Sequence, residues 1–179
     1  MGNVAAQRAP SSLQRLLGLN LIVSANTEAL EMAVDALHAP LPRRFEKAGR
    51  ANWRQRCERA AEGLIKLFPN ADPERLEQTR NILRQASIRI PSLDDARLLA
   101  DTMNLDDFGI AALLQHTLQM GANGADLVQL LNSFSQREQY GYWDARLKED
   151  FHFEQVRQLA AARLENVRKL LATLKAEGE

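Results

Sequence analysis

The chain has 179 residues, 45% of them hydrophobic, and its 23 basic and 23 acidic side chains cancel to a formal net charge of zero at pH 7. This length and composition suit one domain with a sizeable core, and neutrality argues against a free-standing nucleic-acid binder steered by its total charge. The longest uncharged stretch, residues 108–125, contains polar side chains that a bilayer core would penalise, so we expect no membrane partner.

The start of the chain and its single cysteine indicate where the protein works. Residues 1–10 are expected to be a flexible N-terminus, and no secretory signal follows because Gln14, Arg15 and Asn20 interrupt the next apolar run. Cys57 has no second cysteine with which to form an internal disulfide, which suits a reducing compartment. We therefore predict a cytoplasmic protein.

Hydrophobic periodicity predicts an all-α fold. Apolar residues recur at helical spacing along nearly the whole chain, and no segment shows the sustained alternation that is typical of a strand. We expect a single helical domain over residues 11–179, built as a helical bundle of about six to seven helices. A division into sub-bundles over residues 11–88 and 92–179 is left open.

Capping residues and prolines place the first helices. A helical region is predicted over residues 12–38, with a break near residues 24–26 where Asn26 or Thr27 would cap the second piece. Prolines at positions 40 and 42 end this region, and a long helix is predicted over residues 43–68.

The next helix has a clear start signal. Asp72 is a capping residue, and Pro73 follows it at the first helical position, where proline is favoured. We expect this helix over residues 73–88. The Phe68-Pro69-Asn70 stretch leaves only a short connection to the preceding helix.

Two similar sequences mark further helix starts. Ser92 and Asn104 each precede a leucine and two aspartates, a pattern typical of a first helical turn. We expect the second of these helices near residues 105–119, and a pair of glycines marks the turn into another near residues 124–137.

A final long helix is predicted near residues 145–175. Its apolar residues recur at helical spacing and form one stripe that should face the core. This stripe consists of Phe153, Val156, Ala160, Leu164, Val167, Leu171 and Leu174.

The most unusual feature is a local excess of positive charge. Residues 43–59 carry seven basic side chains against two glutamates. On a helix, four of the seven fall within a sector of about 60°. Cationic groups at one-turn intervals match a succession of phosphates, so we predict that they contact nucleic-acid backbone. This basic stripe consists of Arg43, Lys47, Arg50 and Arg54.

An acidic segment offers an alternative explanation for the basic stripe. Residues 92–130 carry six aspartates against one arginine. The basic stripe could therefore pair with this segment of the same chain, or with an acidic partner protein. Under this alternative the arginines stabilise the fold or a protein complex and do not contact nucleic acid.

The sequence contains no recognisable motif for catalysis or metal binding. Glu149 with His152, and Asp35 with His38, have the spacing of two ligands on one helical face, but the other inward carboxylates of a di-metal bundle are missing. No nucleophile motif and no phosphate-binding glycine loop occurs. We therefore predict a protein that is not an enzyme and holds no metal and no cofactor.

Residues 92–151 resemble a known family. They combine a serine-led helix, an acidic turn, a leucine-rich helix, a small-residue turn and an aspartate-led helix that ends in an aromatic and a basic residue. The corresponding positions are Ser92, Arg97, Asp106, Asp107, Leu113, Leu114, Asp126, Leu130, Leu131, Phe134 and Arg137. This pattern resembles the small all-helical subunit (CasB-type) of the type I CRISPR surveillance complex Cascade.

The resemblance implies a role in antiviral defence. Such subunits are not enzymes; they pack against other protein subunits and hold RNA or DNA backbone with arginine and lysine, without reading bases. We expect a non-catalytic helical subunit of this kind. The alternative is a protein–protein interaction module, such as a scaffold, chaperone or regulator, with no nucleic-acid contact. Homo-oligomerisation is left open.

Overall fold

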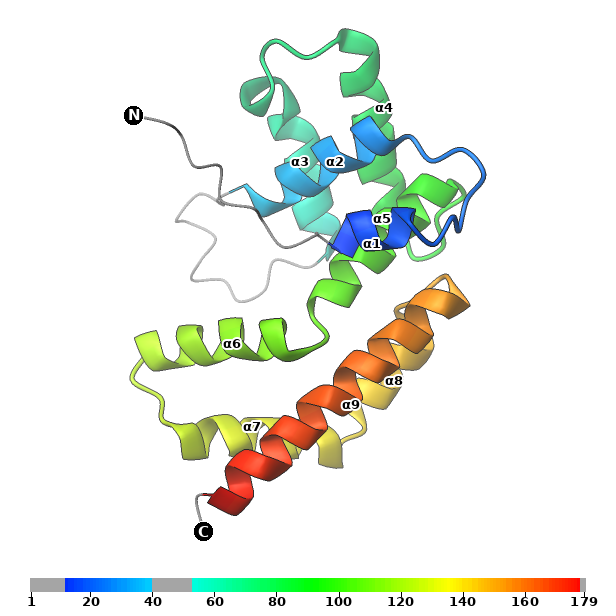
Figure 1. Ribbon diagram of the computed structural model, residues 1–179. Helices are drawn as coiled ribbons and strands as arrows, with labels where there is room; N and C mark the ends of the chain where they lie inside the picture. The colour runs from blue at the N-terminus through cyan, green and yellow to red at the C-terminus, as the bar shows by residue number, and fades with distance from the viewer. Residues whose placement is uncertain (1–11, 40–52, 178–179) are drawn as a thin grey trace, which may run out of the picture. The chain divides into compact units, whose positions relative to one another are not determined.

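The computed structural model describes residues 12–39 and 53–177 (Figure 1). Within these ranges every regular element is a helix and no residue lies in a strand, so the all-α prediction is confirmed. The described residues form nine helices, more than the six to seven expected. The chain divides into two compact units, residues 1–102 and residues 103–179.

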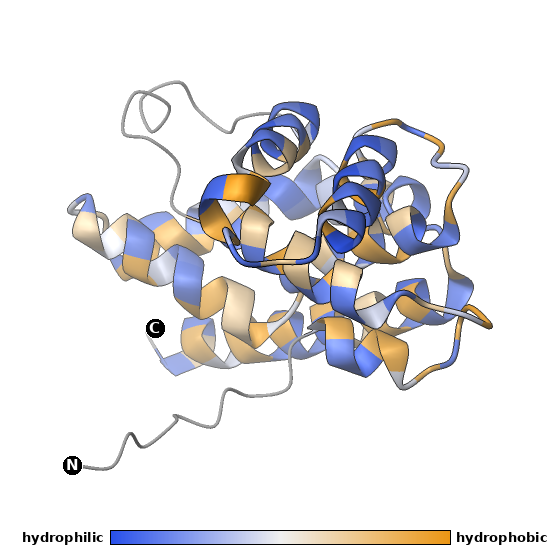
Figure 2. Cartoon of the chain, turned by 90° about the horizontal axis from the view of Figure 1, so that it is seen from above, coloured by the Kyte–Doolittle hydropathy of each residue, from blue (hydrophilic) through white to orange (hydrophobic). Residues whose placement is uncertain are grey.

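Four helices of unit 1 precede the division. They are α1 (Ser12–Leu17), α2 (Thr27–His38), α3 (Trp53–Leu67) and α4 (Pro73–Ala86). Helices α2, α3 and α4 pack against one another. Figure 2 shows that hydrophobic and hydrophilic residues are mixed along the helices of the chain. The buried side chains of α2, α3 and α4 include Leu30, Ala33, Cys57, Leu64, Thr79, Ile82 and Leu83.

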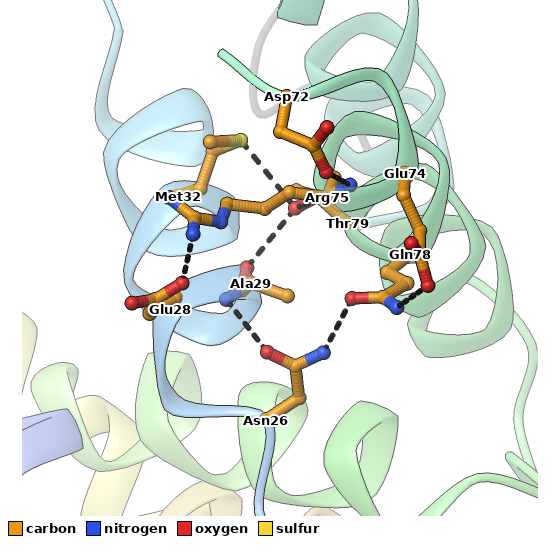
Figure 3. Close-up of polar contacts among 9 residues, drawn as sticks. All are labelled: Asn26, Glu28, Ala29, Met32, Asp72, Glu74, Arg75, Gln78 and Thr79. Carbon is orange, nitrogen blue, oxygen red and sulfur yellow. Dashed lines mark hydrogen bonds and ion pairs between the residues drawn. The ribbon is translucent and has the colours of Figure 1, made fainter.

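Asn26 confirms the predicted cap of α2 and also joins α2 to α4 (Figure 3). Its side-chain oxygen accepts a hydrogen bond from the backbone N–H of Ala29 at 3.1 Å, and its amide nitrogen donates to Gln78 at 2.7 Å. Glu28 forms an ion pair with Arg75 of α4 beside these bonds. The break before α2 is longer than predicted, because α1 already ends at Leu17.

The start of α4 also agrees with its sequence signal. The Asp72 carboxylate accepts a hydrogen bond from the backbone N–H of Arg75 at 3.1 Å, and Pro73 occupies the first turn. The end of α3 at Leu67 lies one residue from its predicted end. The predicted start at residue 43 lies outside the described residues.

Cys57 is fully buried on the side of α3 that faces the core. Burial raises the pKa of its thiol from 9.0 to about 12, and the nearby Arg56 and Glu58 have smaller, opposite effects. A thiol that stays protonated and inaccessible is unreactive. The position of Cys57 therefore indicates a packing role in the core of unit 1.

The buried thiol gives the fold a specific alkaline sensitivity. Below about pH 9 the thiol is protonated in both states, whereas above it the unfolded chain loses the proton that the folded chain keeps. Cys57 should therefore lower the free energy of unfolding by up to about 1.4 kcal/mol per pH unit between about pH 9 and 12. Urea unfolding of wild type and Cys57→Ala at about pH 8 and pH 10 measures this. Equal pH dependence in the two proteins would contradict it.

Asn104 does not begin a helix, which corrects the sequence prediction. It lies inside α5 (Asp94–Asp106), and the next helix starts after Gly109. The side chain of Asn104 is engaged elsewhere, because its amide nitrogen donates to the carbonyl of Asp150 at 2.7 Å. Gly109 has a φ of 109°, a conformation that glycine adopts at no steric cost. The chain turn therefore falls five residues later than predicted.

Unit 2 contains four further helices. They are α6 (Ile110–Ala122), α7 (Leu127–Gln139), α8 (Tyr142–Glu149) and α9 (Glu154–Glu177). Helices α6 and α8 both pack on α9, and α7 packs on α8. Most of the predicted apolar stripe is buried as expected, at Val156, Ala160, Leu164, Val167 and Leu171.

The predicted helix over residues 145–175 is interrupted, which is a second correction. Helix α8 ends at Glu149 and α9 begins at Glu154. Between them Phe151 is buried, with its ring centroid 5.4 Å from that of Phe108. Arg146 holds the same loop through a 2.6 Å bond from its Nε to the Asp150 carboxylate. Burying an aromatic side chain and satisfying this charge require the chain to leave the helix here.

Candidate nucleic-acid interface

Only one residue of the basic stripe belongs to the described residues. Arg43, Lys47 and Arg50 lie outside them, whereas Arg54 is exposed in the first described turn of α3. The Nε of Arg54 donates to the Glu58 carboxylate at 2.8 Å, and 73% of the Arg54 side chain remains accessible. An exposed pair of this kind contributes only a few tenths of a kcal/mol, so Arg54 can exchange it for another anion.

A hydrogen bond from Trp53 joins the start of α3 to the end of α4, where a second group of arginines lies. The indole Nε1 of Trp53 donates to the carbonyl of Ala86, the last residue of α4, at 2.5 Å. Helices α3 and α4 pack together and are joined by only five residues, 68–72, so they run antiparallel. The N-terminal end of α3 therefore lies beside the C-terminal end of α4.

Arginines gather at this end of the α3–α4 hairpin. Residues 53–59 carry three arginines against one glutamate, and residues 77–90 carry the same ratio. All six are exposed or half-exposed, but Arg59 differs from the other five because one of its guanidinium nitrogens is buried. We call these other five the basic end, and they are Arg54, Arg56, Arg80, Arg84 and Arg89.

Two members of the basic end are better placed than the others to bind an anion. Arg84 and Arg89 are exposed and form no side-chain hydrogen bond or ion pair with another described residue. In contrast, Arg80 forms an ion pair with Glu77. Arg56 lies over Trp53, with its guanidinium carbon 5.8 Å from the ring centroid.

The local electrostatics favour an external anion at the basic end. Arg84 lies in the last turn of α4, where its positive charge interacts favourably with the negative end of the helix dipole. A role in helix stability can therefore explain this one arginine without a ligand. Of the remaining arginines, Arg54 and Arg80 pair with Glu58 and Glu77, whereas Arg56 and Arg89 have no counter-charge from a carboxylate among the described residues. A polyanion would supply that counter-charge, and guanidinium groups bind phosphate oxygens in pairs.

The acidic segment finds partners other than the basic stripe within the described residues. Asp94 pairs with Arg97 on the same helix, at 3.0 Å. Asp107 pairs with Arg146 of α8 at 3.1 Å. These contacts stabilise their own helices and loops. Within the described residues, the carboxylates that pair with the basic end are those of Glu58 and Glu77.

The described residues contain no candidate metal site and no candidate membrane span. Over residues 12–39 and 53–177, no three His, Cys, Asp or Glu side chains lie close enough together to hold a metal ion. Glu149 and His152 do not share a helical face, because α8 ends at Glu149. Asp35 and His38 both lie on α2. Among the helices of the described residues, none combines the length and the apolar character needed to cross a bilayer.

Sequence reasoning missed Arg80, Arg84 and Arg89. A signal for them was present, because a short Pro69–Asp72 connection between two helices predicts an antiparallel hairpin. In such a hairpin the end of the second helix returns to the start of the first. The arginines at positions 80–89 would then be expected beside those at positions 54–59.

No protein-family model matches the chain, and neither curated proteins nor solved structures give a significant match. The resemblance of residues 92–151 to the small Cascade subunit stays a prediction.

Proposed function

We propose that this protein is a non-catalytic helical subunit whose basic end binds RNA or DNA backbone within a multi-protein complex in the cytoplasm. The observation that carries the proposal is the hydrogen bond from Trp53 to Ala86, which gathers arginines from two segments about thirty residues apart. The other residues of the basic stripe, Arg43, Lys47 and Arg50, precede α3 in the sequence and lie outside the described residues.

Binding of this kind is independent of base sequence. Phosphate contacts fix a protein on its nucleic acid, but they carry no sequence information. Trp53 lies beside the basic end, and its indole N–H already donates to the carbonyl of Ala86. The zero net charge provides no long-range steering, so the free protein binds weakly and gains affinity when neighbouring subunits hold it in place.

An acidic partner protein is the second candidate for the basic end. Overall neutrality favours it, since free-standing nucleic-acid binders usually carry a net positive charge. Guanidinium groups bind carboxylates as well as phosphates. The two candidates predict different results when an acidic polypeptide competes with nucleic acid for the basic end. A flexible acidic polypeptide has a lower charge density than a nucleic acid, so it should displace bound nucleic acid poorly if the site is built for phosphates.

Fluorescence anisotropy tests the proposal against this second candidate. Labelled single-stranded RNA, single-stranded DNA and duplex DNA, each in two unrelated sequences, are titrated with the full chain at low salt. The proposal expects binding that is similar for unrelated sequences and that excess polyglutamate displaces poorly. Absence of binding to every nucleic acid, or displacement by polyglutamate as efficient as by unlabelled nucleic acid, contradicts it.

A further inference from the structure

Helix α6 has more large apolar side chains than its packing in unit 2 buries. No charged side chain occurs between residues 108 and 125, a stretch that includes the whole helix. One face of α6 packs on α9 through Leu113 and Met120, which belong to a cluster with Val167 and Leu171. A helix that is apolar on more than one face is normally covered on more than one face.

A second apolar stripe of α6 is exposed. It consists of Ile110, Leu114 and Leu118, whose exposed fractions are 42%, 55% and 73%. Their spacing of four residues places them within a sector of about 80°, roughly a third of a turn from the face that packs on α9. Leu127 and Val128, at the start of α7, are exposed as well.

From this pattern we propose that the α6 stripe is a self-association surface that binds the same stripe of a second copy of this chain. Residues four apart form the ridges that interdigitate when two helices cross at about −50°, the commonest helix packing, and both helices then contribute the same type of ridge. The stripe is symmetric about Leu114. A two-fold axis near Leu114 would therefore bring Ile110 of one copy toward Leu118 of the other.

Charge and area also favour a second copy. An uncharged surface meets an identical surface without repulsion, whereas it offers no complementarity to a charged partner. A stripe of three to five large side chains covers a few hundred Å², less than the roughly 800 Å² per partner of a stable interface. The self-association is therefore weak, with a dissociation constant on the order of micromolar to hundreds of micromolar.

Complementary substitutions at Leu114 test this proposal. Sedimentation equilibrium of the full chain from about 1 to about 300 µM should show a reversible dimer of the wild type. Leu114→Glu alone and Leu114→Lys alone should each weaken association at least tenfold, because like charges meet at the axis. An equimolar mixture of the two variants should associate again. Gln115→Glu, on the neighbouring exposed position, is the control and should associate like wild type.

Three outcomes would overturn the proposal. The first is a wild type that stays monomeric over the whole concentration range. The second is a mixture of the Glu and Lys variants that associates no better than either alone. The third is a Leu114→Glu monomer that melts several degrees below wild type, since the stripe would then be packed within the chain itself. The result does not depend on the basic end, so nucleic-acid binding can fail independently.

Discussion

Replacing Arg84 and Arg89 by glutamate is expected to lower nucleic-acid affinity at least tenfold at about 0.1 M salt. These two arginines are exposed and have no ion-pair partner among the described residues, so an incoming phosphate meets no competing carboxylate. Each reversal removes a phosphate contact and adds repulsion. The folded structure should tolerate both, because neither side chain contributes to the buried core of unit 1.

A control variant with two charge reversals elsewhere distinguishes the loss of local phosphate contacts from the change in net charge. Lys169→Glu with Lys175→Glu, on α9 of unit 2, changes the net charge by the same amount at exposed positions. Anisotropy titrations should show near-wild-type affinity for this control. Equal losses in the two variants would mean that only net charge matters. A melting temperature that falls for the Arg84/Arg89 variant, with unchanged affinity, would assign these arginines to the fold.

Replacing Arg146 by alanine is expected to destabilise unit 2 by about 2 to 3 kcal/mol. The Arg146 side chain is only 13% exposed, and it binds Asp150 and Asp107 while lying 5.2 Å from the Phe108 ring centroid. Its loss leaves two carboxylates without their cation at the break between α8 and α9. Asp107 is half exposed, so water compensates part of the loss and the cost stays below that of a fully buried pair.

Tryptophan fluorescence can follow this loss in unit 2 alone. The chain has two tryptophans, so a Trp53→Phe background leaves Trp143 of α8 as the reporter. Urea unfolding should show the lower midpoint for Arg146→Ala, whereas Lys148→Ala, at an exposed position of the same helix, should change stability by less than about 0.5 kcal/mol. A change for Arg146→Ala no larger than for Lys148→Ala would remove this network as the cause of the helix break.

Local signals in the sequence were sufficient to predict several helix boundaries. The caps at Asn26 and Asp72 form within three residues of their own helix starts, so no distant contact decides them. Two predictions were wrong, the helix start at Asn104 and the unbroken helix over residues 145–175. In both cases contacts with distant residues decide the structure. Asn104 bonds to Asp150, 46 residues away, and Phe151 is buried against Phe108. Tertiary contacts of this kind override local propensity.

The candidate site was predictable to a similar extent. The angular position of Arg54 on its helix follows from sequence spacing alone, and the structure places it on an exposed face as expected. Arg84 and Arg89 join it only through the antiparallel packing of α3 and α4. No periodicity within either helix reveals that contact, which is why three of the five arginines of the basic end were missed.

The salt dependence of binding tests the central claim most directly. A surface that neutralises phosphates releases counterions, so log K falls linearly with log salt, by about 0.7 per contact on single strands and about 0.9 on duplex DNA. The five arginines of the basic end predict a slope of about −3.5 to −4.5, or as steep as about −7 if the three remaining stripe residues also bind. A slope near zero, or no measurable binding at about 50 mM salt, would contradict a nucleic-acid function for the basic end.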